Sequence, residues 1–447
     1  MTALHEDRVA GREPGHPDRH DRTAPGGDAQ PLAALRRLVG AAADGFAGTW
    51  GERPLLTRAE DLPRGFEDLL SAGAVDELVS TRGLRTPFLR VAKQGSTLPD
   101  RSFTAGGGVG ATVGDQVSDD KLVRLFADGS TMVLQGLHRT WPPLVRFSQA
   151  LAADLGHPVQ VNAYVTPPQS RGFDDHYDVH DVFVLQVEGE KRWRLHEPVH
   201  PSPLRDQPWT ARRAAVEAEA AREPLLDAVL RPGDCLYLPR GYLHAATALG
   251  DVSTHLTIGV HPWTRHGLAE QLLRTALADL GDDAEVRASL PLGVRVDDPS
   301  STTDDLELVR ERLVAAVRAV DAERLARPLA GQVRANQRAE PVGPLAQLRA
   351  AQEVERTGDA SALVLRRHLA AVLEERADGA VLRSRAGDVV LGADDVAAVR
   401  ALLAAGDAGS VGAALPDAAL SDAALPGAAL PADLARRLVL AGVLVPR

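Results

Sequence analysis

Cysteine is almost absent from this sequence of 447 residues, which contains only Cys235. A lone cysteine excludes an internal disulfide framework and any zinc cluster built from cysteine ligands. A metal ion, if the protein binds one, must therefore be held by histidine and carboxylate side chains.

Long apolar runs are absent as well. No stretch approaches the roughly 18 consecutive apolar residues that would suggest a membrane span. The first 30 residues are rich in Arg, His, Asp, Gly and Pro and contain no apolar signal-peptide core. The sequence therefore predicts a protein that does not enter a membrane, with the cytoplasm as its default location.

Basic residues are fewer than acidic ones, and lysine is scarce. The net charge is −11, which argues against a dedicated nucleic-acid binder, whereas an acidic surface could attract a basic protein. Of the 50 basic residues only Lys93, Lys121 and Lys191 are lysines. A lysine in such a sequence marks a position where the longer, planar arginine side chain would not serve.

The composition is otherwise that of an ordinary globular protein, with 44% hydrophobic and 25% charged residues, and the length suggests two or three packed units. Residues 1–30 lack periodic hydrophobic positions and are expected to form a disordered tail. An amphipathic helix is predicted over 31–46. Between about 157 and 263, short strands separated by Pro and Gly turns predict an antiparallel double-sheet barrel, with one helix inserted near 210–224.

The pattern becomes helical after Trp263 and defines two further units, 265–358 and 359–447. In the last unit we expect a helix over 362–374, a hairpin over 380–392 and a helix over 393–405. The first structured unit, which contains the barrel, then spans 31–264.

Three polar residues at alternate positions precede an apolar run in "DDHYDVHDVFVLQVEGEKRWRL" (174–195): His176, Asp178 and His180. On a strand, alternate side chains share a face, so the three could all point into the mouth of the barrel. Val182 and Val184 would continue that face, and the opposite face would carry Phe183, Leu185 and Val187.

A further histidine, His244, follows two turns in "RPGDCLYLPRGYLHAAT" (231–247). Two histidines and one carboxylate leave three positions open on an octahedral ion, the arrangement found in non-haem Fe(II) oxygenases. The alternative interpretation is a binding barrel whose histidines are structural and hold no metal.

The segments "NAYVTPPQSRGFDDHYDVHDVFVLQVEGEKRWRL" (162–195) and "GDCLYLPRGYLHAAT" (233–247) resemble the ribosomal oxygenase branch of the JmjC-type cupins, which are 2-oxoglutarate-dependent protein hydroxylases. "WGERPLL" (50–56) is also typical of them. The resemblance implies an α+β fold: a double-stranded β-helix (cupin or jelly-roll) barrel, then a helical dimerisation region and a C-terminal winged-helix domain.

The same resemblance implies that His176, Asp178 and His244 are the ligands of Fe(II). It gives His180 no ligand role, and residues four apart on a strand are separated by roughly 13 Å, too far to share one ion easily. His180 would then face the substrate or the ligands from nearby, or make a structural polar contact.

The resemblance further implies that Lys191 pairs with the C5 carboxylate of 2-oxoglutarate. The lysine is expected at the start of a new strand, after a turn over 187–190, and the alternative is a solvent-facing lysine on that turn. Four more residues are candidates for contacting the cosubstrate, with ordinary strand positions as the alternative, and His255 is expected to face away: Asn162, Tyr164, Thr254 and Thr257.

The function implied is hydroxylation of an Arg or His side chain of a ribosomal protein by a homodimeric enzyme. Two alternatives stay open: the same chemistry on a peptide or small natural product, and a regulator that senses a ligand with its barrel and contacts DNA with its winged helix. The acidic balance makes nucleic acid an improbable partner.

Overall fold

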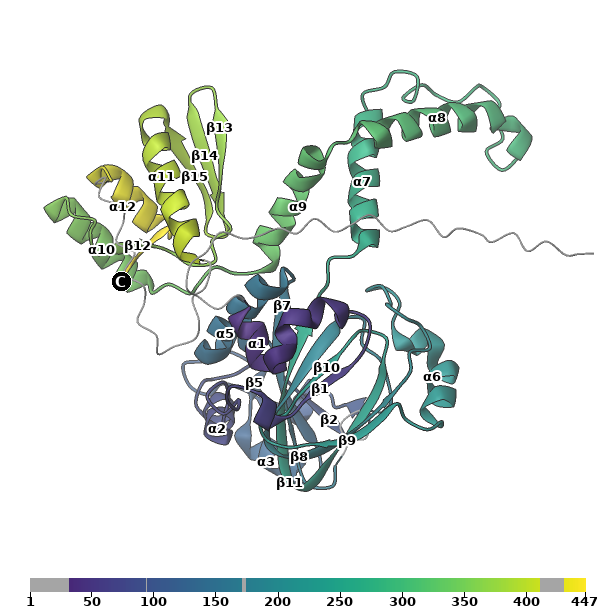
Figure 1. Cartoon of the computed structure of the whole chain (residues 1–447), viewed down its shortest axis with the longest axis vertical. Helices are drawn as coiled ribbons and strands as arrows, with labels where there is room; N and C mark the ends of the chain where they lie inside the picture. Colours follow the sequence, from purple (N-terminus) through teal and green to yellow (C-terminus); the bar gives the residue numbers. More distant parts are fainter. Residues whose placement is uncertain (1–31, 94, 171–173, 411–429) are drawn as a thin grey trace, which may run out of the picture.

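The computed structural model describes residues 32–93, 95–170, 174–410 and 430–447. Figure 1 shows a β-rich part, a helical segment that projects from it, and a smaller C-terminal part. The tail predicted over 1–30 lies outside the described residues.

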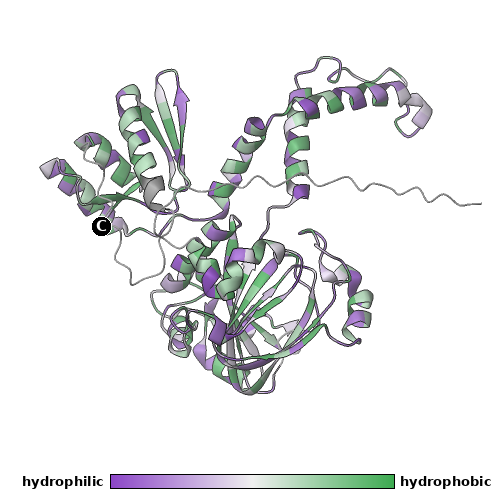
Figure 2. Cartoon of the chain, viewed as in Figure 1, coloured by the Kyte–Doolittle hydropathy of each residue, from purple (hydrophilic) through white to green (hydrophobic). Residues whose placement is uncertain are grey.

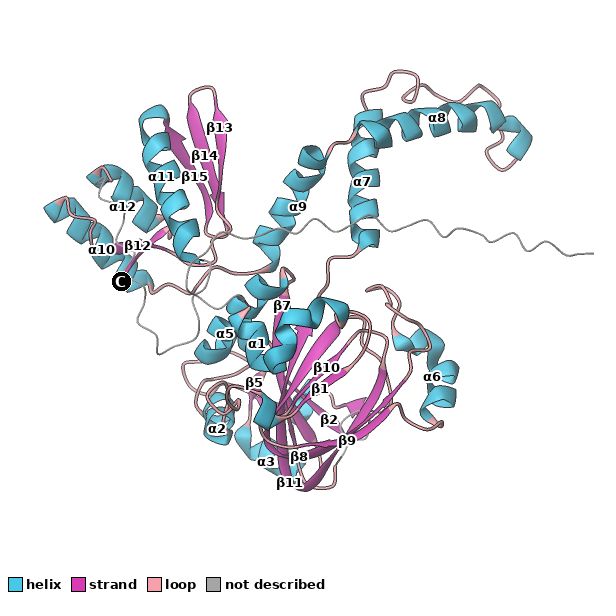
Figure 3. Cartoon of the chain, viewed as in Figure 1, coloured by secondary structure: helices cyan, strands magenta, loops and turns pink. Residues whose placement is uncertain are grey.

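The β-rich part confirms the α+β class and the antiparallel sheet expected between about 157 and 263. Its strands, magenta in Figure 3, are β1 (Leu55–Thr57), β2 (Leu89–Lys93), β3 (Ser96–Thr97), β4 (Thr104–Ala105), β5 (Gln116–Val117), β6 (Thr131–Leu134), β7 (Val159–Thr166), β8 (Asp181–His196), β9 (Leu226–Leu230), β10 (Cys235–Leu238) and β11 (Leu243–Val260). Its α-helices are α1 (Ala33–Val39), α2 (Ala72–Ser80), α3 (Asp119–Ala127), α4 (Leu137–Thr140), α5 (Pro142–Leu155) and α6 (Arg213–Ala220). The helix predicted over 31–46 is α1 continued by a 3₁₀ helix, Gly40–Gly48.

The main sheet has the strand order β1-β10-β8-β11-β7-β6-β2-β3, with β9 paired to β8 beside this path. The long strands β8 and β11 pair twice: residues 243–249 with 190–196, and residues 254–260 with 181–188. The register shifts between the two stretches. Gly189 stands there with φ 65°, and a Cβ on it would lie 2.1 Å from the Val252 carbonyl oxygen, so only glycine fits the bend.

The two faces of β8 bury different neighbours, as the alternation predicts. Phe183 and Leu185 pack into the large core shared with α1 and α5. Val182 and Val184 pack instead against Trp193 and other apolar side chains of β8, β9 and β10. The two halves of β8 therefore face each other across the interior of the sheet, whose strands are mostly apolar in Figure 2.

The helical segment consists of α7 (Arg265–Leu280), α8 (Thr303–Ala319) and α9 (Ala322–Asn336). Neither α8 nor α9 has a buried residue, and α8 extends away from the β-rich part (Figure 1). None of the described helices is long and apolar enough to span a bilayer.

The C-terminal part has its own core and two small sheets. Its elements are α10 (Pro344–Thr357), β12 (Leu363–Leu365), β13 (Val372–Arg376), β14 (Gly379–Ser384), β15 (Gly387–Gly392), α11 (Ala393–Ser410), α12 (Ala432–Leu440) and β16 (Leu444–Pro446). The hairpin predicted over 380–392 is formed by β14 and β15, and α11 begins where the helix over 393–405 was expected.

The helix predicted over 362–374 is wrong. This stretch forms β12, which pairs with β16, and the beginning of β13, which pairs with β14. Between them His368 and Ala370 have φ of 58° and 47°, which no α-helix allows. The apolar spacing of this stretch is compatible with a helix, but strand pairing with distant residues overrode that local preference.

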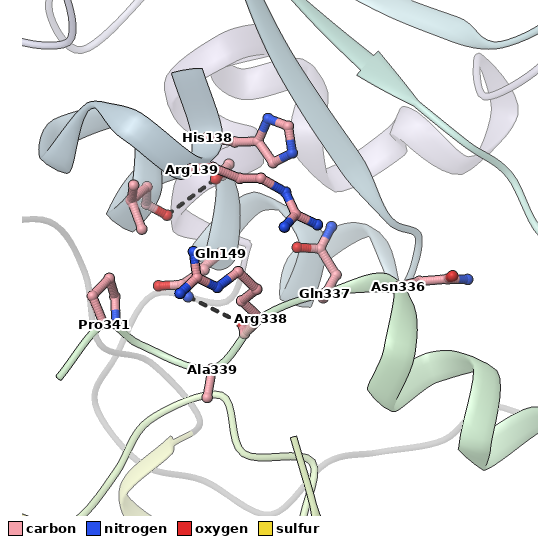
Figure 4. Close-up of a pocket in the computed structure, with 10 residues that line it drawn as sticks. His138, Arg139, Gln149, Asn336, Gln337, Arg338, Ala339 and Pro341 are labelled. Atoms are coloured by element: carbon pink, nitrogen blue, oxygen red, sulfur yellow. Dashed lines mark hydrogen bonds between the residues drawn. The ribbon is translucent and has the colours of Figure 1, made fainter. Parts of the chain in front are cut away.

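The connection between α9 and α10 is docked on the β-rich part (Figure 4). The Gln149 side-chain amide donates to the Arg338 carbonyl at 3.1 Å, and Gln337 donates to the Val159 carbonyl at 3.2 Å. A small pocket remains between this connection and α4–α5, with His138 and Arg139 among its lining residues. The C-terminal part is thus attached to the sheet by direct hydrogen bonds as well as by the chain.

A carboxylate from another helix caps the start of α1. Leu32, which precedes the helix, provides no side-chain cap, and Asp154 at the end of α5 accepts the backbone N–H groups of Ala34 and Leu35 at 2.8 and 3.0 Å. Burial raises the pKa of Asp154, although these two donors lower it.

We expect Asp154→Ala to reduce the free energy of unfolding by about 1–2 kcal/mol, because two buried amide donors lose their acceptor. Hydrogen exchange at Ala34 and Leu35, together with urea unfolding, measures the effect. The exposed Asp76→Asn on α2 is the control. Unchanged exchange at both amides in the Ala variant would contradict the assigned cap.

Candidate metal centre

The segment that holds His176 and Asp178 is irregular and precedes β8, so the strand predicted there is wrong. His176 forms a single antiparallel bridge with His244. The His176 N–H donates to the His244 carbonyl at 3.2 Å, and the His244 N–H donates back at 2.8 Å. The bridge brings the two imidazoles side by side, with ring centroids 4.4 Å apart.

Tyr177 gives His176 and Asp178 their common direction. Its side chain is 1% exposed, packs with Val216 and Leu243, and donates from its hydroxyl to the Gln207 carbonyl at 3.0 Å. Since Tyr177 is anchored on this side, its two neighbours are directed the opposite way. The alternation expected from a strand is here produced by one buried anchor.

His176, Asp178 and His244 form a group that could hold a metal ion. Each offers one ligand atom, and these atoms lie within 4.8 Å of one another. The distance between His244 Nε2 and Asp178 Oδ2 is 3.9 Å. The bridge and the Tyr177 anchor thus assemble two imidazoles and one carboxylate from separate parts of the chain.

The hydrogen bonds of the two histidines fix their tautomers. His176 Nδ1 lies 2.7 Å from the Asp174 carbonyl oxygen, and His244 Nδ1 lies 3.2 Å from that of Tyr242. A carbonyl oxygen only accepts, so each Nδ1 carries the proton and each Nε2 keeps its lone pair. The donor atoms therefore fit a divalent transition metal before any ion arrives.

The charges of the group suit the same role. Burial, and next the positive charge of His176, lower the pKa of His244 to about 4, so this imidazole is neutral at neutral pH. Burial raises the pKa of Asp178. Four neighbouring groups lower it by more, so the net shift is downward: His180, His244, His176 and Arg90. Metal binding requires neutral imidazoles and an ionised carboxylate.

His180 lies outside this group. Its ring stacks on His261, with centroids 5.1 Å apart and planes inclined by 12°. A Cβ on Gly259 would lie 2.6 Å from the His180 ring, so the absent side chain of Gly259 makes room for it. The observed contacts of His180 are with β11 and the residue after it.

Lys191 is buried within β8, with 3% of its surface exposed, so the solvent-facing alternative is excluded. The strand runs unbroken through Gly189, and the turn and new strand predicted there are wrong. Nζ donates to Thr166 Oγ1 at 3.0 Å and lies 3.4 Å from His255 Nδ1. Burial lowers the pKa of Lys191 to about 7.

The register between β7 and β11 places the remaining candidates. Asn162 lies opposite Thr257, and Tyr164 lies opposite His255 with the two rings stacked at 4.9 Å. Directly paired residues share a face. Asn162 also accepts the Gly136 N–H at 3.1 Å.

Thr254 and His255 both differ from expectation. Thr254 lies opposite Val165, a residue of the large outer core, so Thr254 belongs to the outer face. His255, predicted to face away, contacts Lys191 and Tyr164 on the inner face. Both follow from regular alternation along β11, whose register with β7 is unbroken here. His255 is two residues from Thr257 and shares its face, whereas Thr254 is three residues away and lies on the opposite face.

Sequence reasoning missed Arg90 and Trp193. Arg90 on β2 hydrogen-bonds to Tyr164 and its charge lowers the pKa of Asp178, yet nothing near it in the sequence marks it. The Trp193 ring lies 6.0 Å from that of His244 and meets His255 edge-on at 5.5 Å. Trp193 stood two residues after Lys191 in the quoted motif, and strand parity could have identified it.

Comparison with known proteins places these residues in a described domain. The family model of the JmjC domain matches residues 139–268. Ribosomal oxygenase 1 of Gallus gallus is 40% identical over 149 residues, 33% of this chain and 24% of that protein. The bifunctional lysine-specific demethylase and histidyl-hydroxylase NO66 of Aedes aegypti is 27% identical over 284 residues, 61% and 41% of the two chains.

The chain thus matches about a quarter to two fifths of these curated relatives. A solved structure of the Escherichia coli ribosomal oxygenase YcfD, in complex with cobalt and succinic acid, shares the fold with a TM-score of 0.50 at 17% identity. It covers 91% of this chain and 98% of its own. With the His176, Asp178 and His244 group in the matched segment, the chain is a JmjC-domain protein related to the ribosomal oxygenases.

Proposed function

We propose that the protein is an Fe(II)- and 2-oxoglutarate-dependent hydroxylase that acts on a protein side chain. The observation that carries the proposal is a facial set of two imidazoles and one carboxylate in the same sheet as a buried lysine that has no carboxylate partner among the described residues. When bound, iron and 2-oxoglutarate supply the oxidation: one dioxygen atom enters a substrate C–H bond, and the other enters succinate as carbon dioxide leaves.

His176, Asp178 and His244 would hold the iron. Both Nδ1 atoms face carbonyl oxygens, which leaves each Nε2 for the metal, and three ligands leave three positions for cosubstrate and oxygen. The related YcfD binds cobalt and succinic acid, a divalent metal and a dicarboxylic acid of the product's kind.

Lys191 would bind the C5 carboxylate of 2-oxoglutarate. A buried ammonium without an opposite charge is costly, and an anionic ligand removes that cost. Asn162, Tyr164 and Thr257 lie on the same inner face and would contact the cosubstrate by hydrogen bonds. The apolar side chains of Val184 and Trp193 exclude water from the interior between the two halves of β8.

The names of the relatives support a substrate class for this proposal. They are named ribosomal oxygenases and a histidyl-hydroxylase, so we propose an Arg or His side chain of a ribosomal protein as the target. The net charge of −11 favours association with a basic protein.

The C-terminal unit, 359–447, is proposed to be a winged-helix-like module that contacts protein rather than DNA. Its three-stranded sheet packs beside α11, and the arginines of α12 are already paired. Arg436 contacts Glu355, and Arg437 contacts Asp395 and Asp433. Neutralised cations contribute little attraction for phosphates.

The helical unit, 265–358, is proposed to mediate a homodimer. On α8, Leu306, Val309, Leu313 and Val317 share one face by helical spacing, and the helix buries none of its residues. Leu306 is 55% exposed and Val309 is 39% exposed. Helix α8 contacts α7 in its own chain, but Leu306 and Val309 stay exposed, and an exposed apolar stripe of this kind is expected to pack against a second copy.

We expect His244→Ala and Asp178→Ala to abolish succinate formation, because two remaining ligands do not retain iron. Fe(II) binding by calorimetry and succinate release, with and without ribosomal extract, measure this. His180→Ala, which removes a neighbouring ring but no ligand, should keep Fe(II) affinity within about threefold. Full activity in His244→Ala, or no succinate from the unaltered protein, would refute the proposed function.

We expect Lys191→Met to raise the KM for 2-oxoglutarate by about 30-fold or more, since the C5 carboxylate loses its buried partner. Fe(II) affinity should be preserved. Lys93→Met, which removes the exposed lysine paired with Asp128, is the matched control and should leave the KM unchanged. An unaltered KM in Lys191→Met would exclude the assigned role.

We expect the double variant Leu306→Glu/Val309→Glu to be monomeric in light scattering at concentrations where the unaltered protein is dimeric, because the apolar stripe becomes charged. Ala315→Glu, on the opposite face of α8, should leave the mass unchanged. A monomeric unaltered protein would contradict the proposed dimer.

A further inference from the structure

The Lys191 ammonium is held by neutral groups only. Thr166 Oγ1 accepts one hydrogen bond at 3.0 Å, and His255 Nδ1 lies at 3.4 Å on the other strand beside it. Within the described chain no carboxylate lies at ion-pair distance from Nζ, although Lys191 is 3% exposed. The positive charge is therefore oriented but not compensated.

Two aromatic contacts fix the orientation of the His255 ring. Its face stacks on Tyr164, with centroids 4.9 Å apart and planes inclined by 5°. Its edge meets Trp193 at 5.5 Å with an angle of 86°. His255 is itself buried, and these two contacts hold the plane of its ring, with Nδ1 3.4 Å from Lys191 Nζ.

His255 is uncharged in this environment. Burial first, and then the positive charge of Lys191, keep the pKa of His255 well below its usual value. A neutral imidazole facing an ammonium presents the lone pair of Nδ1 and carries its proton on Nε2. It can thus align the ammonium without cancelling its charge, which an aspartate or glutamate at this position would do.

The other groups around Lys191 do not supply a negative charge either. On β7 the neighbours are Thr166 and Tyr164, and Arg90 on β2 lies behind Tyr164. Across the pairings, Lys191 faces Ala248 of β11 and Leu230 of β9. On β8 itself, Glu190 pairs with Arg231 at the surface.

We propose that His255 is a positioning residue: together with Thr166 it orients the Lys191 ammonium in the interior between the two halves of β8 while leaving the charge free for the carboxylate of a dicarboxylate ligand. The identity of that ligand as 2-oxoglutarate rests on the proposed function. The contact between His255 and Lys191, and the absence of charge on His255, do not depend on the identity of the ligand.

The contact can be tested without any ligand, because the chain has three lysines and Lys191→Met assigns the signal of Lys191. In protein labelled with ¹³C-lysine, the pH titration of Lys191 is followed by NMR in the unaltered protein, His255→Asn and His255→Asp. A carboxylate beside Nζ should raise the Lys191 pKa by about 1 to 3 pH units, whereas Asn should leave it within about half a unit. An unchanged titration in a His255→Asp protein that still binds Fe(II) would overturn the proposal.

Cosubstrate affinity gives the second readout. His255→Asp should raise the KM for 2-oxoglutarate by about tenfold or more even though its lysine is more fully protonated, because the charge is now paired internally. His255→Asn should restore the KM to within about threefold, and kcat at saturating 2-oxoglutarate should change little in either variant. A merely structural role would lower kcat and affinity together and would not move the lysine titration.

The two proposals fail in different ways. If the unaltered protein forms no succinate, the proposed function fails, and the NMR titration still decides the role of His255. If succinate forms and His255→Asp binds 2-oxoglutarate as tightly as the unaltered protein, the proposed function stands and His255 is not the positioning residue.

Discussion

The double antiparallel pairing of β8 with β11 is the constraint on which the metal centre depends. Because both strands bend at Gly189 and the register shift, their two halves face each other across one interior. The bridge between His176 and His244 attaches the segment before β8 to the other edge of β11, since His244 also pairs with Leu195 of β8. Two residues far apart in sequence thus become neighbours through backbone hydrogen bonds alone, and their side chains need only point the same way.

The interior contains two kinds of polar group, the His176, Asp178 and His244 group and the Lys191 ammonium, which differ in how their charges are compensated. His244 is neutral because burial lowers its pKa, and although burial raises the pKa of Asp178, the neighbouring histidines and Arg90 lower it by more. Lys191 is different: its ammonium is removed from water and offered only neutral acceptors. Under the proposed function, the C5 carboxylate of 2-oxoglutarate would compensate this charge.

The projecting helices and the C-terminal part lie outside the sheet that carries the candidate metal centre. Helices α8 and α9 contact α7 but bury none of their residues, so apolar side chains such as Leu306 and Val309 of α8 stay exposed. The connection near Gln337 ties the last part to β7, the strand that carries Asn162 and Tyr164. Any protein bound to the outer parts is therefore held on the same scaffold as the metal centre.

The sequence by itself indicated the antiparallel sheet, because alternation and turn residues are local properties. Motif spacing and resemblance to a family singled out the candidate ligands His176, Asp178 and His244 and the candidate Lys191. Tertiary structure decided the rest. A buried Tyr177 replaced the expected strand, and pairing with β14 and β16 converted a predicted helix into strands. Each of these outcomes depends on hydrogen bonds to residues distant in sequence, which no local pattern encodes.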